Sequence, residues 1–434
     1  MQLDYDIIPQ ILLYFLGFFV VMYILYRPYF FSVIDPLFVF VFTTAFASVL
    51  VVEVVPDMAS IVHFFACQLC LFIGFSVVQG RFSTMFMNSS KEVHFENTAV
   101  LQMTVYFLFA LYLIGNLTLF FTKGFALLSS SPSDSKVANF QGGFGIFRKI
   151  NWAAGGFITV GLLYLYLKLR RLKFLLLLLI VAFFTAFEGS KGALVRIVTA
   201  FVLLVCHPAF NNQAVLLTSF KKYIPIALIS VFSIFFTVLI KENEDTEQAL
   251  FAFLRRFLYS GDVVLYYYAP INQNYFARYD FMDYPSYILN TVLGFLRLAP
   301  YKEAFGNVMV ENAIPAFAQA DVIVGPNTPF YIEGKIFFGY YGAFIHSLLI
   351  GTVYAFIRRT YFSLTSGSAF QFVFWACLCQ LGGNVFTDTS LFVTVLFDTC
   401  FFVLPAYALA CFVVDKKMTF RHLRLFAINL GGSV

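Results

Sequence analysis

Several charged residues in this sequence have the types and spacing needed to bind an anion or to move a proton. The first group is Glu188-Gly189-Ser190-Lys191-Gly192, followed by Arg196. Glycines let backbone N–H groups approach phosphate oxygens, so two cations beside them predict a pocket for a lipid phosphate or pyrophosphate. The alternative is an internal pair of Glu188 with Lys191, with Arg196 reaching outward.

Arginines form the second group. Arg255 and Arg256 are adjacent, and Arg278 lies next to Tyr279 and Asp280. Paired guanidiniums suit a diphosphate because each offers a planar fork of donors and keeps its charge. We therefore expect Arg255, Arg256 and Arg278 to join Lys191 and Arg196 in binding pyrophosphate. The alternatives are headgroup binding by an interfacial helix for the first two, and a loop ion pair for Arg278.

Carboxylates form the third group, and Glu333 and Asp388 are the candidate catalytic bases because each lies where an apolar span begins. Asp398 lies about two turns into the last span, where a charge should be protonated or paired. His346 lies at similar depth, so a contact with Asp398 is one interpretation and a satisfied core histidine is the other. No nucleotide loop, HExxH motif or spaced metal cluster is present, and we expect no cofactor or metal.

Composition identifies the elements that must position these residues. Of the 434 residues, 61% are hydrophobic and only 12% are charged, about half the charged fraction of soluble domains. Apolar runs of about 17 to 25 residues recur along the chain, which predicts an all-α integral membrane protein. All seven cysteines fall in or beside apolar runs, which favours packing over disulfides or metal binding.

About eleven transmembrane helices are expected, and Lys and Arg in the short connections all fall on one side of the membrane. This pattern predicts a periplasmic N-terminus, a cytoplasmic C-terminus and outward loops at 122–151 and 241–335. The chain then divides into 1–240, with about eight spans, the large outward loop 241–335, and 336–434, with three spans. The predicted spans are 7–26, 37–55, 60–79, 98–121, 152–169, 174–187, 193–207, 223–240, 336–357, 369–385 and 391–414.

The large loop contains its own helical patterns. Apolar residues recur at helical spacing in 246–268 and again in 287–298, each around arginine. Such segments are typical of interfacial helices that lie on a membrane surface. Tyr266, Tyr267 and Tyr268 suit this place, because a ring can be half buried while its hydroxyl stays hydrated.

One stretch resembles a known family. Pro326-Asn327-Thr328-Pro329, Glu333 and Gly339-Tyr340-Tyr341-Gly342 resemble the turn, acidic residue and Gly-x-x-Gly that follow the large periplasmic loop of Wzy-type polysaccharide repeat-unit polymerases. The Gly-Ser-Lys-Gly stretch before Arg196 resembles another small and basic region of these proteins. The family includes polymerases of O-antigen, enterobacterial common antigen and capsule.

The resemblance implies a GT-C-like glycosyltransferase of the bacterial inner membrane. It would join oligosaccharides carried on undecaprenyl pyrophosphate, as donor and acceptor, together with a chain-length regulator (co-polymerase) and with no nucleic acid. An O-antigen ligase-like transferase shares the loop and the lipid donor but uses lipid A core as acceptor. A lipid-linked oligosaccharide flippase is the alternative from another class, and it should line a central cavity with charges from several spans.

Overall fold

The computed structural model describes residues 8–80, 94–129, 132–140, 143–188, 193–213, 261–315 and 325–415. Within these ranges, eight helical segments are long and apolar enough to cross a membrane: 9–29, 36–54, 58–79, 98–128, 145–169, 330–363, 369–387 and 389–414. Each coincides with a predicted span. The protein is therefore a helical, multi-pass membrane protein.

Two further predicted spans, 174–187 and 193–207, appear as the shorter apolar helices α9 (Leu172–Phe187) and α10 (Ala193–Val205). The span predicted at 223–240 lies outside the described residues. So do most of the helical pattern at 246–268 and the residues Lys191, Arg255 and Arg256.

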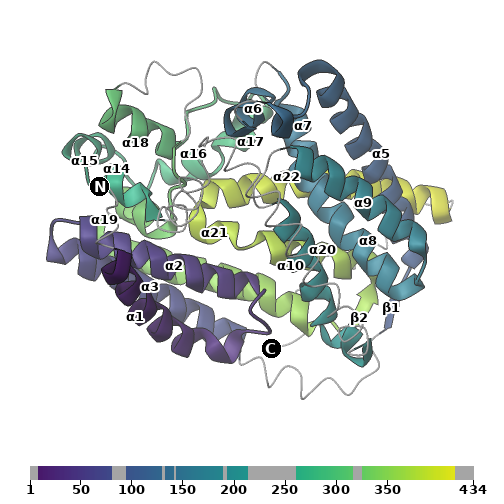
Figure 1. The fold of residues 1–434 in the computed structure, drawn as a ribbon, viewed down its shortest axis with the longest axis horizontal. Helices are drawn as coiled ribbons and strands as arrows, with labels where there is room; N and C mark the ends of the chain where they lie inside the picture. Colours follow the sequence, from purple (N-terminus) through teal and green to yellow (C-terminus); the bar gives the residue numbers. More distant parts are fainter. Residues whose placement is uncertain are drawn as a thin grey trace.

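The described helices pack into two groups (Figure 1). The first group contains α1 (Ile8–Tyr26), α2 (Pro36–Val54), α3 (Met58–Gln79) and α19 (Phe330–Ser363). Within it, α3 packs along most of α19 and α1 packs on α2. Small residues allow this approach, because a Cβ on Gly74 would lie 2.0 Å from the Leu348 carbonyl oxygen.

The second group contains α5 (Thr98–Lys123), α8 (Gly155–Leu169), α9, α10, α20 (Ala369–Leu381) and α22 (Thr389–Asp415). Each group has its own hydrophobic core. The first half of α19 belongs to one core and its last turns, including Tyr361, belong to the other. Functional residues at the start of α19 and of α22 are therefore brought together from different groups.

The connections are mostly short helices. They are η2 (Arg27–Tyr29), η3 (Ala126–Leu128), α6 (Pro132–Ala138), α7 (Gly145–Lys149), the π-helical turn η4 (Ile150–Ala154), η5 (Pro208–Gln213) and α21 (Asn384–Thr387). One pair of three-residue strands, β1 (His94–Glu96) and β2 (Ser366–Ser368), runs parallel with Phe95 opposite Gly367.

The large loop folds onto one end of the bundle as α14 (Val263–Tyr267), α15 (Pro270–Phe276), α16 (Tyr284–Ile288), α17 (Asn290–Phe295) and α18 (Phe305–Ala313). The pattern predicted at 287–298 is thus two short helices with Arg297 in a left-handed turn after them. Val263, Val264 and Tyr267 are buried in the core. Tyr267 is therefore a packing residue, whereas an interfacial position was predicted for it.

A buried ion pair joins α2 to α19 at the opposite end of the bundle. Both Arg358 and Asp35 are 0% exposed, and the Arg358 guanidinium donates to Asp35 Oδ1 at 2.7 Å and to the Tyr29 carbonyl at 2.9 Å. Asp35 also caps α2 by accepting from the Leu37 N–H at 2.9 Å. Arg358 and Arg359 follow the predicted span 336–357 and belong to the basic residues of the short connections, which are expected on one side of the membrane. Of these two arginines, Arg359 is exposed and Arg358 is buried.

Candidate active site

A glycine breaks α19 near its start and positions the first candidate base. Gly339 has φ 70° and ψ −171°, a conformation that glycine adopts without the steric cost of a side chain. The segment before the break folds back on the segment after it, since a Cβ on Gly334 would lie 2.9 Å from Ala343 Cα and 3.2 Å from His346 Nδ1. We call 330–338 the short arm of α19.

Glu333 lies on the short arm and is fully buried. Three donors surround its carboxylate. The Thr389 N–H donates to Oε1 at 2.9 Å, the Thr389 hydroxyl donates to Oε2 at 2.6 Å, and the Tyr287 hydroxyl donates to Oε1 at 2.9 Å. All three partners donate, so the enclosed carboxylate oxygens accept three hydrogen bonds.

Asp388 adjoins this carboxylate from the other helix group. It has an extended backbone between α21 and α22 and accepts from the Leu391 N–H at 2.8 Å. Burial raises the pKa of Asp388 to about 6, although the backbone N–H groups of Leu391, Thr328 and Ser390 oppose that shift. Asp388 is only partly buried, whereas Glu333 is fully buried. Asp388 is thus the more accessible carboxylate of the pair.

A chain of hydroxyl and imidazole groups extends from Glu333 to His346. The Tyr284 hydroxyl lies 3.0 Å from His346 Nε2 and 3.3 Å from Thr389 Oγ1. His346 Nδ1 lies 3.1 Å from the Phe330 carbonyl, which can only accept, so Nδ1 carries a proton. With a second proton on Nε2, donors would run in one direction from His346 through Tyr284 and Thr389 to Glu333. Donors arranged in this direction would pass a proton from His346 toward Glu333.

Of the two interpretations of His346, the structure supports a buried histidine with satisfied hydrogen bonds and not a contact with Asp398, because each residue has another partner. His346 bonds Tyr284 and the short arm, whereas Asp398 accepts from Lys149 Nζ at 2.8 Å. The expectation that Asp398 is paired is confirmed. The partner was not predicted, because Lys149, the last residue of α7, is distant from Asp398 in sequence.

A cluster of cations surrounds Trp152 in the π-helical turn η4. The Arg148 guanidinium lies 4.4 Å from the centre of the indole ring and the Arg196 guanidinium lies 5.6 Å from it. The indole N–H donates to Glu188 Oε1 at 3.3 Å. Glu188 therefore bonds a tryptophan here, and its alternative partner Lys191 lies outside the described residues. We call Arg148, Arg196 and Trp152 the cation cluster; Lys149 follows Arg148 in the chain but contacts Asp398 and the Phe295 ring.

Tyr301 lies within electrostatic reach of both the cation cluster and the carboxylate pair. Partial desolvation raises the pKa of Tyr301, Arg148 lowers it, and Glu303 and Asp388 raise it further. Arg148 and Asp388 therefore act on the same phenol. This relation connects the cation cluster to the carboxylates, although the residues come from loops that are far apart in the sequence.

Arg278 is located elsewhere. Its guanidinium stacks over the Tyr275 ring at 3.8 Å, and the Tyr279 hydroxyl, followed by Tyr275, raises its pKa. The predicted residues Glu333 and Asp388 are thus brought together, whereas Arg196 and Arg278 contact different aromatic groups.

Sequence reasoning missed Arg148, Lys149, Tyr284, Tyr287 and Thr389. Nothing in the sequence marks Tyr287 or Thr389 as a site residue, because tyrosine and threonine are common throughout this chain.

The cysteines and the metal-ligand types give simpler results. All seven cysteines are free, in agreement with their predicted packing role. No group of three or more His, Cys, Asp or Glu side chains that could hold a metal ion is found within the described ranges.

Removal of one hydrogen-bond donor to Glu333 should measurably lower the stability of the protein. Tyr287→Phe deletes the 2.9 Å hydrogen bond to the buried carboxylate, and hydrogen bonds to charged groups contribute about 1.5–3 kcal/mol. We expect a lower thermal unfolding temperature for the purified variant. Tyr341→Phe is the control, because Tyr341 is 79% exposed. Equal unfolding temperatures for the two variants would contradict the assigned hydrogen bond.

Comparison with known proteins adds no family name, because no family model, curated protein or solved structure matches this chain.

Proposed function

We propose that this protein is a membrane glycosyltransferase that joins lipid diphosphate-linked oligosaccharides into a polymer at the outer face of the bacterial inner membrane. The observation that carries the proposal is the pair of Glu333, bonded by Thr389 and Tyr287, and Asp388, bonded by the Leu391 N–H, at the junction of the two helix groups. An isolated carboxylate is costly at such a position, so two adjoining carboxylates, with the pKa of Asp388 raised by burial, favour a chemical role.

In the proposed reaction, Asp388 accepts the proton of an acceptor sugar hydroxyl. The hydroxyl oxygen attacks the anomeric carbon of the donor glycan and forms the new glycosidic bond. The bond between that carbon and the diphosphate oxygen breaks, and the lipid diphosphate leaves with the bonding electrons. The donor is already activated by its leaving group, so the protein mainly orients two sugars and stabilises the departing charge. This function requires neither a nucleotide nor a metal.

The cation cluster supports the second part of the reaction. Arg148 is exposed and stacks on Trp152, while Lys149 is engaged by Asp398. A stacked guanidinium is oriented by the ring but keeps its donors for a phosphate. We assign diphosphate binding to Arg148 and Arg196, together with the predicted residues Lys191, Arg255 and Arg256 outside the described ranges.

Replacement of Arg148 tests the diphosphate assignment. Arg148→Ala should lower the transfer rate about 10²-fold, the typical effect of losing one group that stabilises developing charge. Lys123→Ala is the matched control, because Lys123 also lies over an aromatic ring, that of Phe144, at 5.2 Å. The measurement is polymer length and amount from purified protein in nanodiscs. Equal rates for both variants would remove Arg148 from the site.

The function itself is tested with purified protein and a synthetic repeat unit on undecaprenyl pyrophosphate. A ladder of increasing length supports the polymerase. Elongation only after addition of lipid A core would identify a ligase instead. Passage of the lipid-linked substrate across liposomes with no new glycosidic bond would identify a flippase and end the enzyme proposal.

A further inference from the structure

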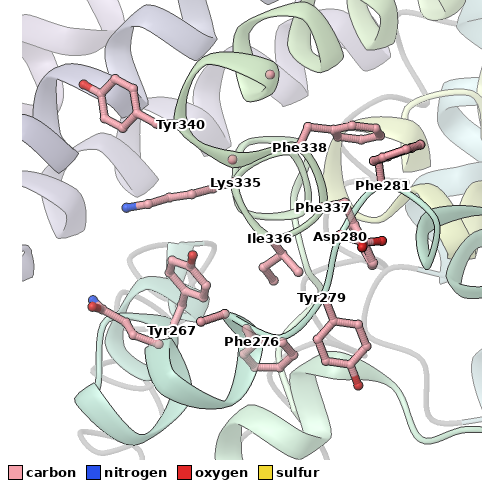
Figure 2. A pocket seen from close by; sticks show the side chains of 14 residues that line it. Tyr267, Phe276, Tyr279, Asp280, Phe281, Lys335, Ile336, Phe337, Phe338 and Tyr340 are labelled. Atoms are coloured by element: carbon pink, nitrogen blue, oxygen red, sulfur yellow. The ribbon is translucent and has the colours of Figure 1, made fainter.

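An open groove lies beside the short arm of α19. It has a volume of about 730 Å³, within the range of roughly 300–1,000 Å³ that is usual for ligand sites. Figure 2 shows its lining from the short arm on one side and from the loop helices around α15 on the other. Lys335 and Asp280 extend toward opposite ends of the groove in this view.

The walls of the groove are aromatic, but polar groups stand at their edges. Phe276, Tyr279, Phe281, Phe337 and Phe338 supply ring surfaces, while Gln273, Asp280 and Lys335 supply hydrogen-bonding groups. Tyr267 and Tyr340 add hydroxyl-bearing rings. Sugars have apolar C–H faces and hydroxyl edges, so flat rings with polar groups around them match a carbohydrate chain better than a lipid tail, which would leave the polar groups without partners.

Lys335 gives the groove a positive end. Its ammonium donates to the Ser60 hydroxyl at 3.2 Å and lies 4.8 Å from the centre of the Tyr268 ring and 5.8 Å from that of Tyr267. Asp57 acts on it at longer range, as part of the cap of α3. The close partners of the ammonium are thus a hydroxyl and two ring faces, which hold the cation in place and leave it able to bind an anion.

The groove adjoins the carboxylate pair through shared aromatic residues. Phe337 and Phe338 line the groove, and their ring centres lie 5.2 and 5.0 Å from that of Tyr284. Phe337 also lies 5.0 Å from Tyr287, which donates to Glu333. The rings of Phe337 and Tyr287 therefore connect the groove to Glu333, the carboxylate that adjoins the proposed base Asp388.

We propose that this groove binds the acceptor oligosaccharide, and that Lys335 selects an acceptor that carries an acidic sugar, such as a uronic acid. This inference rests on the proposed function and adds a substrate class to it. The carboxylate of the sugar binds at the Lys335 end, and the neutral sugars stack along Tyr279 and Phe337 toward the carboxylate pair.

Binding tests this proposal independently of transfer. The probes are a soluble tetrasaccharide that contains glucuronic acid and its carboxyl-reduced, neutral analogue, titrated into the Asp388→Asn protein in nanodiscs. We expect tighter binding of the acidic probe. Lys335→Gln should weaken the acidic probe about tenfold, which is about 1.4 kcal/mol, and leave the neutral probe unchanged. Lys335→Arg should restore the preference, and Tyr279→Leu should weaken both probes.

Three results would overturn the assignment. The first is that Lys335→Gln, with unchanged thermal unfolding, binds the two probes equally and binds the acidic probe as tightly as the protein that retains Lys335. The second is no binding of either probe at millimolar concentration. The third is competition of phosphatidylglycerol with the acidic probe, combined with loss of bound phosphatidylglycerol in Lys335→Gln, which would make the groove a lipid headgroup site. If the transfer assay gives a polymer ladder but neither probe binds, the proposed function stands and only the assignment of the groove to the acceptor is rejected.

Discussion

Asp388→Asn should reduce glycan transfer by about 10²–10⁴-fold, the usual contribution of a general base. Asparagine keeps the size of the side chain and can still accept from the Leu391 N–H, so the fold should persist. It cannot take the proton from an acceptor hydroxyl. Initial rates with a lipid diphosphate-linked repeat unit, measured at saturating substrate, provide the comparison.

The pH dependence gives the same prediction a second measurement. The pKa of Asp388 is raised to about 6, so the base is protonated and inactive below that pH. The transfer rate of the unmodified protein should rise through about pH 6 and level off above it, whereas the residual rate of Asp388→Asn should lack this step. Asp283→Asn, on the neighbouring loop, is the control. If the pH profile of Asp388→Asn shows a rise in transfer rate of the same position and size, the titrating group is another residue.

Arg358→Met should destabilise the folded protein by about 3–5 kcal/mol, because it leaves the fully buried carboxylate of Asp35 without its counter-ion. Asp35→Asn combined with Arg358→Met should recover most of this loss, since asparagine removes the buried charge and can still cap α2. Thermal unfolding and the monodisperse yield after extraction are the measurements.

The neighbouring arginine is the control for the second prediction. Arg359 is exposed and donates to the Val78 carbonyl at 3.0 Å, so Arg359→Met should change the free energy of unfolding by less than about 1 kcal/mol. Similar unfolding temperatures for Arg358→Met and Arg359→Met would show that the buried ion pair contributes no more than a surface contact.

Sequence reasoning succeeded where a local signal was strong. Apolar runs predicted the long helices, because a segment that crosses lipid must be apolar and must satisfy its own backbone. Glu333 and Asp388 were selected as candidate bases because an acidic residue stands out at the start of an apolar span, and the structure brings these two residues together. Local reasoning did not separate the buried Arg358 from the exposed Arg359, because the sequence shows two adjacent arginines although successive helical residues point about 100° apart.

The rest of the site depends on contacts between distant segments. Lys149 meets Asp398 and Tyr287 meets Glu333 only after the loops fold onto the bundle. No periodicity marks these partners, and charged or tyrosine residues occur in every loop. The break at Gly339 was equally hidden, because an apolar run that contains glycine looks like one continuous span. Such features arise from tertiary packing, which local patterns do not encode.

The fold-back at Gly339 also determines which motions reach the carboxylate. The short arm is attached to the large loop through Pro329 and is held to the rest of α19 by the His346 contact with Phe330. Glu333 is therefore fixed both to the membrane-crossing part of its own helix and, through Thr389, to α22. The separation of the two carboxylates thus depends on the angle of this fold-back as well as on the packing of α19 against α22.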